Sequence, residues 1–522
     1  MKLNIQDTFN KKLQADPSLR NYRRQVEEAC FSYVTPRIPS NPSVVHVSDD
    51  MLTAIGLDAD DAKSESFRKV FSGAEVIPNT SPYAMCYAGH QFGHWAGQLG
   101  DGRAINLCEV NNNNTSWALQ LKGAGETPYS RSADGLAVLR SSIREHLCSE
   151  AMHHLGVPTT RSLSLSLTGD EVMRDMLYDG NADYEKGAVV CRVAPSFLRF
   201  GSYQIFMARE DKDTLKTIVD YTINHFHSHI INRENEGYLQ FFQEVVDKTL
   251  DMVLHWQRVG FVHGVMNTDN MSILGLTIDY GPYGWLEGYD PGCTPNTTDA
   301  QGKRYRYGNQ PNMALWNLMQ LANALNVLVD DVPALEAILK TYQQTYPKRY
   351  FVMMGQKIGI VTQGESDMKF IQELEQVLQL TETDMTIFFR LLSDIDQVSM
   401  NEKDALNLVK EAFYVPTEVI DDLQHSWLSW FRKYLDRLTE VDAITSDRKK
   451  KMDAVNPKYV LRNYMAQLAI DKANDGDYAL IDELYQLLKD PYSDQPENQE
   501  WFAKRPEWAR NKVGCSMLSC SS

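Results

Sequence analysis

The sequence has a shortage of basic residues relative to acidic ones. It contains 52 lysines and arginines against 69 aspartates and glutamates in 522 residues, so its formal net charge is −17. A negative surface opposes binding to the phosphates of nucleic acids and to anionic lipids. We therefore expect no nucleic-acid partner and no attachment to a membrane surface.

Cysteines and long apolar runs are also scarce. The eight cysteines include no paired C-x-x-C motifs that would suggest zinc, and they are too few for a secreted disulfide framework. No run approaches the roughly 18 continuous apolar residues of a membrane span. The first residues show neither an apolar signal segment nor an arginine-rich presequence. These absences predict a cytoplasmic protein with mostly buried thiols, and a mitochondrial form stays open as an alternative.

A polar loop near the middle of the chain is similar to the catalytic loop of kinases. Such loops read His-x-Asp-x-x-x-x-Asn and precede a second Asp, which binds metal together with the Asn. Aligned on His263, these metal positions hold Asn270 and Asp279. Residues 273–278 predict two short strands that turn back at Gly275. The alternative interpretation is a polar loop whose side chains cap backbone groups.

One residue of this loop departs from the kinase pattern. The position where a phosphotransferase has its base holds Val265, which cannot accept a proton. Asp269 is the only nearby carboxylate that is free to act as a base, and it lies at a different point relative to the metal. The pattern argues against ordinary phosphoryl transfer. It indicates that a bound nucleotide presents a different phosphate.

Two other segments carry residue types that bind phosphate. Residues 87–103 are rich in glycine, which permits a close approach of the backbone to phosphate, although glycine loops are also common as plain turns. Arg192 and Arg199 suit a polyphosphate because the guanidinium group is permanently charged and bidentate.

The elements between these segments have the order of a kinase small lobe. Residues 103–110 and 116–122 predict a strand pair that ends at Lys122. Residues 136–155 predict a helix that carries Glu145. A strand lysine and a helix glutamate position phosphates in kinases. Each residue alone is also compatible with a solvated surface charge.

The pattern as a whole predicts an α+β, protein-kinase-like fold of two lobes with extensions at both ends. The length suits about three domains or one two-lobed catalytic unit with extensions. We predict an N-terminal extension, a small β-rich lobe, a larger helical lobe and a C-terminal helical extension, at residues 1–80, 81–200, 201–440 and 441–522.

Motifs spread over most of the chain resemble the selenoprotein O family of kinase-like protein adenylyltransferases, called YdiU in bacteria. The resemblance runs from about residue 80 to the end, and several of its motifs lie in the segments already described. The motifs are at residues 79–84, 89–93, 120–125, 142–145, 192–201, 263–270, 456–463 and 519–522.

The resemblance implies transfer of AMP from ATP to Ser, Thr or Tyr hydroxyls of target proteins. The nucleotide would be reversed relative to protein kinases, which accounts for Val265. Asp269 becomes the general base, and Asn270 and Asp279 bind Mg²⁺ or Mn²⁺. The implied nucleotide contacts are Gly100, Gly102, Arg103, Lys122, Asp134, Gly135, Arg192, Arg199 and Asp279, and Glu145 pairs with Lys122.

The resemblance also implies redox control through the end of the chain. Cys520 lies where some family members have selenocysteine, and Cys293 and Cys515 are rival partners for a disulfide. Cys293 is shifted by two residues from the usual position, which Pro295 occupies. The alternative is a frayed tail with reduced thiols.

Other functions stay open at this point. UMP transfer from UTP and conventional phosphorylation are the alternatives to AMP transfer, and a catalytically silent nucleotide-binding scaffold is a third class. We expect a monomer. The sequence names neither the target proteins nor the preferred metal.

Overall fold

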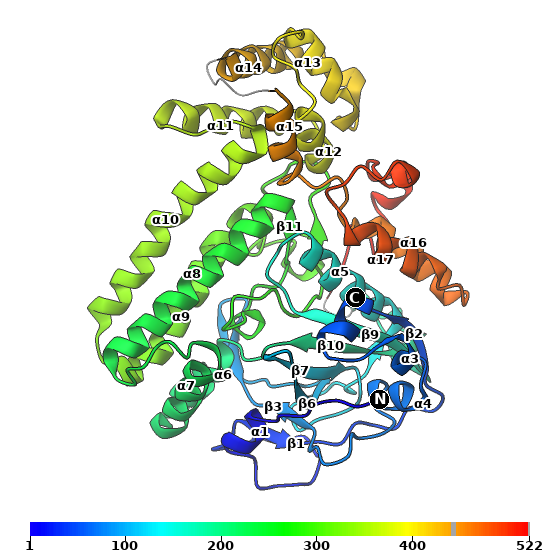
Figure 1. Ribbon diagram of the computed structural model, residues 1–522, viewed down its shortest axis with the longest axis vertical. Helices are drawn as coiled ribbons and strands as arrows, with labels where there is room; N and C mark the ends of the chain where they lie inside the picture. Colours follow the sequence, from blue (N-terminus) through cyan, green and yellow to red (C-terminus); the bar gives the residue numbers. More distant parts are fainter. Residues whose placement is uncertain (440–444, 520–522) are drawn as a thin grey trace.

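The structure is a computed structural model that describes residues 1–439 and 445–519. Strands dominate the chain up to Ala194, and the chain beyond this point is mainly helical (Figure 1). The predicted order of a β-rich part followed by a helical part is confirmed. None of the helices in these residues is long and apolar enough to cross a membrane.

The β-rich part is built on one antiparallel sheet. Its strands follow the order β1, β3, β6, β7, β10, β9 and β2 across the sheet. The side chains of the central strands are buried on both faces, since Gln120 and Leu121, which are successive residues of β7 and point to opposite faces, are both fully buried. The strands are β1 (Phe31–Tyr33), β2 (Ser43–Val47), β3 (Tyr83–Met85), β6 (Ala104–Asn112), β7 (Thr115–Lys122), β9 (Arg161–Arg174) and β10 (Asp183–Ala194).

The predicted strand pair before Lys122 is confirmed as β6 and β7. Asn112 pairs with Thr115, so the strands are joined by a two-residue turn. Both turn residues, Asn113 and Asn114, have positive φ angles of 51° and 62°. Asparagine adopts this left-handed conformation more readily than other side chains do. The turn fixes the register that brings Lys122 to the end of β7.

Helix α5 (Leu139–His154) packs against β9 and β10. The helix predicted over residues 136–155 is confirmed, although it begins later because Ala137 and Val138 form a short strand, β8, that pairs with β10. On its other side α5 packs against α16 (Asn463–Asn474) and α17 (Ala479–Lys489) (Figure 1). The C-terminal part of the chain therefore returns to cover the β-rich part.

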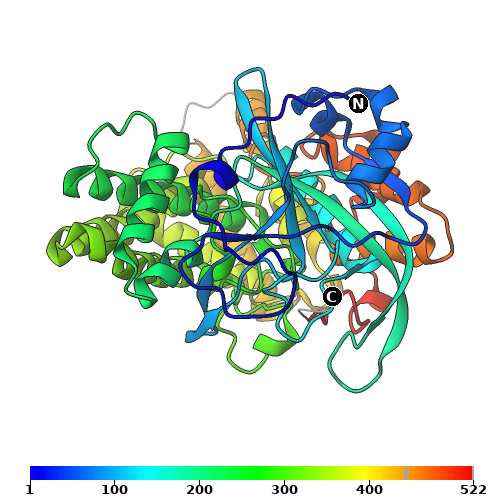
Figure 2. The ribbon, with the colours of Figure 1, turned by 90° about the horizontal axis from the view of Figure 1, so that it is seen from below.

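Residues 1–80 supply the two edge strands of the sheet. β1 pairs with β3, and β2 pairs with β9. Figure 2 shows the N-terminal chain running across the β-rich part. The sheet thus contains strands from both sides of the predicted boundary at residue 80. The three boundaries between the four predicted parts stay predictions, and the one after residue 440 lies outside the described residues. Three short helices follow β2, namely α2 (Asp49–Ala54), α3 (Ala59–Ala62) and α4 (Glu65–Phe71).

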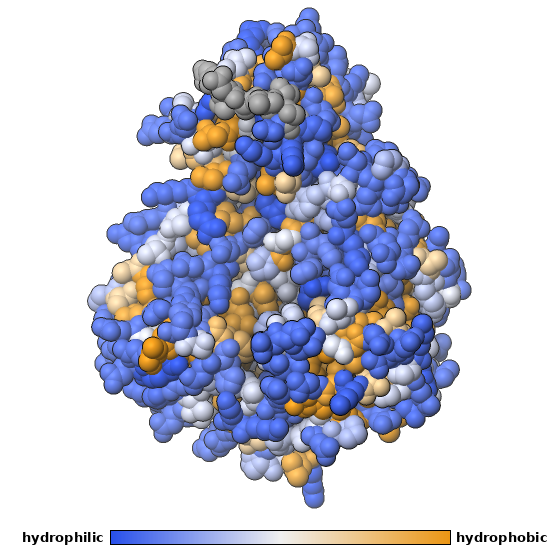
Figure 3. Space-filling model, viewed as in Figure 1, coloured by the Kyte–Doolittle hydropathy of each residue, from blue (hydrophilic) through white to orange (hydrophobic). Residues whose placement is uncertain are grey.

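The helical part contains a layer of long helices and a second apolar core. Helices α8, α9 and α10 pack side by side (Figure 1). The second core surrounds Trp427 and Trp430, and Trp430 stacks on Phe370. The visible face of the molecule is mainly hydrophilic (Figure 3). The helices are α8 (Asn235–Val259), α9 (Gln310–Val329), α10 (Val332–Ile358), α11 (Glu365–Leu378), α12 (Met385–Leu392), α13 (Glu402–Leu408) and α14 (Asp421–Thr439).

The predicted hairpin at residues 273–278 is wrong. The segment does turn at Gly275, which has a φ of 68°. Its two arms bond to other parts of the chain rather than to each other. The Ile273 amide donates to the Leu198 carbonyl at 3.0 Å, and the Thr277 amide donates to the Pro158 carbonyl at 2.8 Å. The apolar pattern therefore reflects burial between neighbouring segments and not a strand pair.

A buried ion pair joins α5 to β9 and predicts a large effect on stability. The guanidinium of Arg161 donates two hydrogen bonds, of 2.8 and 2.7 Å, to Glu150, which is 1% exposed. Removal of one partner leaves a buried charge without compensation. We expect Arg161→Leu to lower the free energy of unfolding by about 3–5 kcal/mol, measured by urea titration.

The matched control for this prediction is an exposed ion pair. The side chains of Lys63 and Asp60 are 77% and 94% exposed. We expect Lys63→Leu to change the free energy of unfolding by less than about 1 kcal/mol. Equal effects of the two substitutions would contradict the assigned role of the Arg161–Glu150 pair.

Candidate active site

A cavity of about 770 Å³ lies between the β-rich part and the helical part of the chain. Residues from the sheet line one side, and the loop after His263 lines the other. The structure brings all the expected nucleotide contacts to this cavity, while their roles stay predictions. The lining includes Gly100, Gly102, Arg103, Lys122, Asp134, Gly135, Arg192, Arg199, Asp269, Asn270 and Asp279.

Hydrogen bonds from two polar side chains, a buried histidine and a partly buried asparagine, fix the conformation of the loop. His263 follows β11 (Phe261–Val262) and is 2% exposed. Its Nε2 lies 2.9 Å from the Ile278 carbonyl, and its Nδ1 accepts from the Val265 amide at 3.3 Å. Burial lowers the pKa of His263, which favours the neutral ring that this bonding requires. The Asn270 amide donates to the Val265 carbonyl at 2.9 Å.

Asp279 is held between two buried arginines. Arg192 bonds to one of its carboxylate oxygens and Arg199 to the other. Burial alone would raise the pKa of Asp279, but the charges of Arg199, Arg192 and Lys122 hold it well below its usual range. The backbone of Asp279 has a φ of 60°, a region that aspartate tolerates better than most residues. The carboxylate is therefore charged and fixed in direction.

Lys122 and Glu145 form a buried ion pair beside Asp279. The lysine Nζ lies 2.5 Å from a carboxylate oxygen of Glu145, which is 3% exposed. Arg192 approaches the other carboxylate oxygen at 3.2 Å. Burial lowers the pKa of Lys122 to about 8, and the negative charge of Glu145 opposes part of this shift. The pair is not solvated, and the lysine lines the cavity.

The Asp269 carboxylate has a different environment. It is 7% exposed, and burial raises its pKa to about 6. Gln91 Nε2 donates to its Oδ2 at 3.1 Å, which opposes part of the shift. Its Oδ1 has no hydrogen-bond partner among the described residues. An aspartate with a pKa near neutrality is a suitable proton acceptor.

Among the glycines that line the cavity, two lie in the glycine-rich segment and a third is at residue 135. Gly100 and Gly102 line the cavity, where added side chains would lie 2.4 Å from the Tyr129 ring and 2.9 Å from its carbonyl oxygen. Gly135 is more restricted, because its φ is 72° and an added Cβ would lie 2.2 Å from a backbone oxygen. Only glycine fits these three positions without a shift of the neighbours.

Asp134 lies at the rim of the cavity and pairs with Arg174 at the end of β9. The guanidinium donates two hydrogen bonds of 2.8 and 2.9 Å to the carboxylate. Asp134 also accepts from the Leu136 amide at 3.0 Å. Arg174 lines the same cavity. Sequence reasoning missed this arginine, because the β9–β10 turn carried no signal that linked it to Asp134.

A buried polar network behind the two arginines was also missed. Asp101, 2% exposed, accepts from the Met85 amide at 3.0 Å and from Gln120 Nε2 at 3.2 Å. The side-chain oxygen of Gln120 in turn accepts from Arg192. Asp101 lies between two glycines and reads as an ordinary turn residue. Its position inside the glycine-rich segment at residues 87–103 was the only available signal.

The cavity offers oxygen atoms that suit a divalent cation. Mg²⁺ is usually bound by one or two carboxylates together with substrate phosphates and waters. Asp279 provides the carboxylate. The Asn270 amide nitrogen already donates to Val265, which leaves its carbonyl oxygen as the ligand atom. In the described ranges no group of three or more His, Cys, Asp and Glu side chains could hold a metal by itself. The residues thus fit an ion completed by phosphates.

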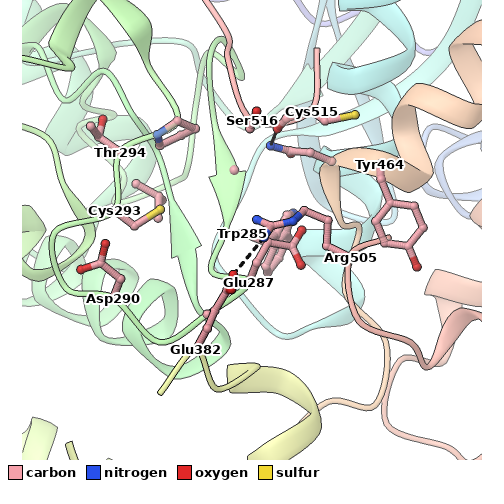
Figure 4. Close-up of a pocket in the computed structure, with 15 residues that line it drawn as sticks. Trp285, Glu287, Asp290, Cys293, Thr294, Glu382, Tyr464, Arg505, Cys515 and Ser516 are labelled. Carbon is pink, nitrogen blue, oxygen red and sulfur yellow. Dashed lines mark hydrogen bonds and ion pairs between the residues drawn. The ribbon is translucent and has the colours of Figure 1, made fainter. Parts of the chain in front are cut away.

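The described cysteines are free thiols, and all but Cys293 are buried. Cys293 and Cys515 line a separate cavity of about 360 Å³, and Figure 4 shows their sulfur atoms far apart. Burial raises the pKa of Cys293 to about 12 and that of Cys515 to about 11, so both are protonated at neutral pH. Cys520 lies outside the described residues.

Comparisons with known proteins match nearly the whole chain to the family that its motifs resemble. Residues 15–489 match the family model described as protein adenylyltransferase SelO. Protein nucleotidyltransferase YdiU of Flavobacterium johnsoniae is 60% identical over 520 residues, covering 100% of this chain and 99% of the relative. Protein nucleotidyltransferase YdiU of Rhodopirellula baltica is 53% identical over 536 residues, covering 100% of this chain and 99% of the relative.

The fold, the cavity and these likenesses define an enzyme of the nucleotidyltransferase class. The chain belongs to the SelO family of protein adenylyltransferases. The resemblance found in the motifs is thereby confirmed over nearly the whole sequence.

The lysine in the cavity predicts a measurable contribution to nucleotide binding. A charge-assisted hydrogen bond contributes about 1.5–3 kcal/mol, which corresponds to roughly 10- to 100-fold in affinity. We expect Lys122→Met to weaken ATP binding by this factor, measured by thermal shift against ATP concentration. Lys216→Met, at an exposed lysine of α7 (Lys212–Phe226), should bind ATP like the wild type. Unchanged affinity in Lys122→Met would contradict a phosphate contact.

Proposed function

We propose that this enzyme transfers AMP from ATP to Ser, Thr or Tyr hydroxyls of target proteins and releases pyrophosphate. The observation that carries the proposal is the buried Asp269, which has a pKa of about 6 and lies next to Asn270 in a loop where Val265 occupies the usual base position. The names of its relatives support a protein as the acceptor.

The residues of the cavity suit an in-line displacement at the α-phosphorus. The acceptor oxygen forms a bond to phosphorus, its proton goes to Asp269, and the bond to the β-phosphate oxygen breaks. Pyrophosphate leaves with the bonding electrons. Lys122 and Arg192 face the cavity and would hold phosphates in place, so the reaction depends on positioning more than on covalent chemistry. A Mg²⁺ or Mn²⁺ ion on Asn270 and Asp279 would neutralise phosphate charge.

The arrangement also supports a kinase-like fold with a reversed nucleotide. The Lys122–Glu145 pair, the loop after His263 and Asp279 have the chain order of kinase elements. Val265 is 6% exposed and apolar, which disfavours transfer of the γ-phosphate by a kinase mechanism.

UMP transfer from UTP is the second candidate, because the phosphate contacts suit either nucleotide. The presence of Lys122, Asp269 and Asp279 together in the cavity argues against a catalytically silent nucleotide-binding scaffold.

We also propose that the C-terminal tail controls activity through a disulfide. The tail lies close to the loop that carries Cys293, since the Thr297 amide donates to the Leu518 carbonyl at 2.8 Å and the Leu518 amide donates to the Pro295 carbonyl at 3.2 Å. Oxidation would join Cys520 to Cys293 or Cys515. A low-molecular-weight disulfide would accept the two electrons and the two protons.

Labelled nucleotides test the transferred group. Reduced protein is incubated with target-containing lysate, Mg²⁺ or Mn²⁺, and ATP labelled at the α- or the γ-phosphate. We expect protein-bound label only from the α-position, and none in Asp269→Ala. Label only from the γ-position would make the enzyme a kinase. Stronger labelling from α-labelled UTP at equal concentration would favour UMP transfer.

Removal of the proposed metal ligand tests the role of Asp279. We expect Asp279→Ala to abolish transfer, because it removes the carboxylate that holds the cation near the phosphates. Asp60→Ala, at a side chain that is 94% exposed, serves as the matched control and should retain activity. Retained AMP transfer in Asp279→Ala would rule out the metal assignment.

Peptide mapping tests the disulfide. After exposure to oxidised glutathione, non-reducing digestion should yield a peptide that links Cys520 to Cys293 or Cys515, with lower activity that a reductant restores. Detection of all three thiols as free under these conditions would exclude the disulfide.

A further inference from the structure

A small hairpin in the glycine-rich segment is docked on the catalytic loop. It consists of β4 (Ala88–Gln91) and β5 (His94–Gln98), and it packs beside α6 (Gly201–Ala208). Its contacts to the loop join residues about 180 positions apart in the chain, so local sequence does not create them. The hairpin is outside the main sheet.

Three hydrogen bonds connect this hairpin to three consecutive residues of the loop. The Phe92 amide donates to Asn267 Oδ1 at 3.1 Å, and the His90 amide donates to Thr268 Oγ1 at 2.7 Å. Gln91, between them, donates from Nε2 to Asp269 Oδ2 at 3.1 Å. The two backbone bonds fix the hairpin on the loop, so the Gln91 amide has a defined place relative to the Asp269 carboxylate.

Tyr305 and Gln204 support this docking from the helical part. The Tyr305 hydroxyl donates to Asn267 Oδ1 at 2.6 Å and accepts from the Phe92 amide at 3.0 Å. Gln204 Nε2 lies 3.2 Å from His90 Nδ1. These contacts on both sides of Gln91 restrict the motion of the hairpin. The Gln91 side chain therefore has a fixed position relative to Asp269.

The other oxygen of the Asp269 carboxylate is restricted by a glycine. A Cβ added to Gly89 would lie 2.7 Å from Asp269 Oδ1 and 3.0 Å from Asp269 Cβ. The carboxylate therefore has the Gln91 amide at Oδ2 and the bare Gly89 backbone beside Oδ1. Gln91 and Asp269 both line the nucleotide cavity. The hairpin thus determines which way the carboxylate faces in that cavity.

We propose that Gln91 is a positioning residue for nucleotidyl transfer, which orients the Asp269 carboxylate toward the acceptor hydroxyl through its hydrogen bond to Oδ2. The inference rests on the proposed role of Asp269 as general base. Gln91 itself takes no part in the proton transfer. Without its amide, the carboxylate can rotate about its Cβ–Cγ bond and lose the orientation in which it meets the hydroxyl.

The test separates the rate of the chemical step from nucleotide binding. Gln91→Met keeps the length of the side chain and removes the donor. We expect kcat for AMP transfer to fall on the order of 10- to 100-fold, while KM for ATP and the melting temperature stay close to those of the wild type. Gln91→His restores an N–H donor and should recover most of the lost kcat.

A second isosteric variant and a control complete the experiment. Gln91→Glu replaces the donor by an acceptor and should lower kcat as Gln91→Met does. With two variants, the inference can still be tested if one of them fails to fold. His94→Ala is the matched control, since His94 is the exposed cross-strand partner of Gln91. It should leave kcat unchanged.

The outcomes distinguish the inference from the proposed function. Full kcat in Gln91→Met, with Asp269→Ala inactive, would overturn the positioning role and leave the base assignment intact. A higher KM for ATP together with a lower melting temperature, and no recovery in Gln91→His, would mean that Gln91 is only structural. Transfer of α-label by Asp269→Ala would instead reject the base assignment itself.

Discussion

The position of one carboxylate between two arginines determines the geometry of the whole site. Arg192 comes from the sheet and Arg199 from the segment that leads into the helices, and both contact Asp279. Arg199 also donates to the backbone carbonyl of Asp269 at 2.7 Å. The same contacts therefore join the β-rich part, the helical part and the loop after His263. Removing three charged groups from water is costly, and their mutual pairing offsets this cost.

This pairing also explains how two aspartates in one cavity have opposite properties. The pKa of Asp279 lies well below its usual range, whereas burial raises that of Asp269 to about 6. The difference follows from the arginines. Both guanidinium groups contact the Asp279 carboxylate, whereas Arg199 contacts Asp269 only at its backbone carbonyl. A pair of carboxylates with separated pKa values is typical of sites in which one group binds charge and the other moves a proton.

Patterns within short windows predicted much of this structure. The strand pair before Lys122 and the helix that carries Glu145 depend on local sequence, and both form as expected, except that the helix begins at Leu139. The hairpin predicted at residues 273–278 is wrong, because an apolar run indicates burial but does not indicate which segment it packs against. Gln91 and Asp101 were missed for a related reason: their contacts depend on the tertiary fold. The remaining site residues were predicted only from the family motifs, because the spacing of residues alone does not assign their roles.

The enclosure of α5 has a consequence for regulation. Protein kinases are switched by moving the helix that carries the glutamate of their own lysine–glutamate pair, which breaks and remakes that pair. Here most of the helix is buried, with the sheet on one side and α16 and α17 on the other. Tyr485 of α17 even bonds to Ser48, the residue that donates to Glu150 of α5. Such a helix is held in place on both sides, so control of this enzyme has to act elsewhere than on the Lys122–Glu145 pair, as the proposed disulfide of the tail would.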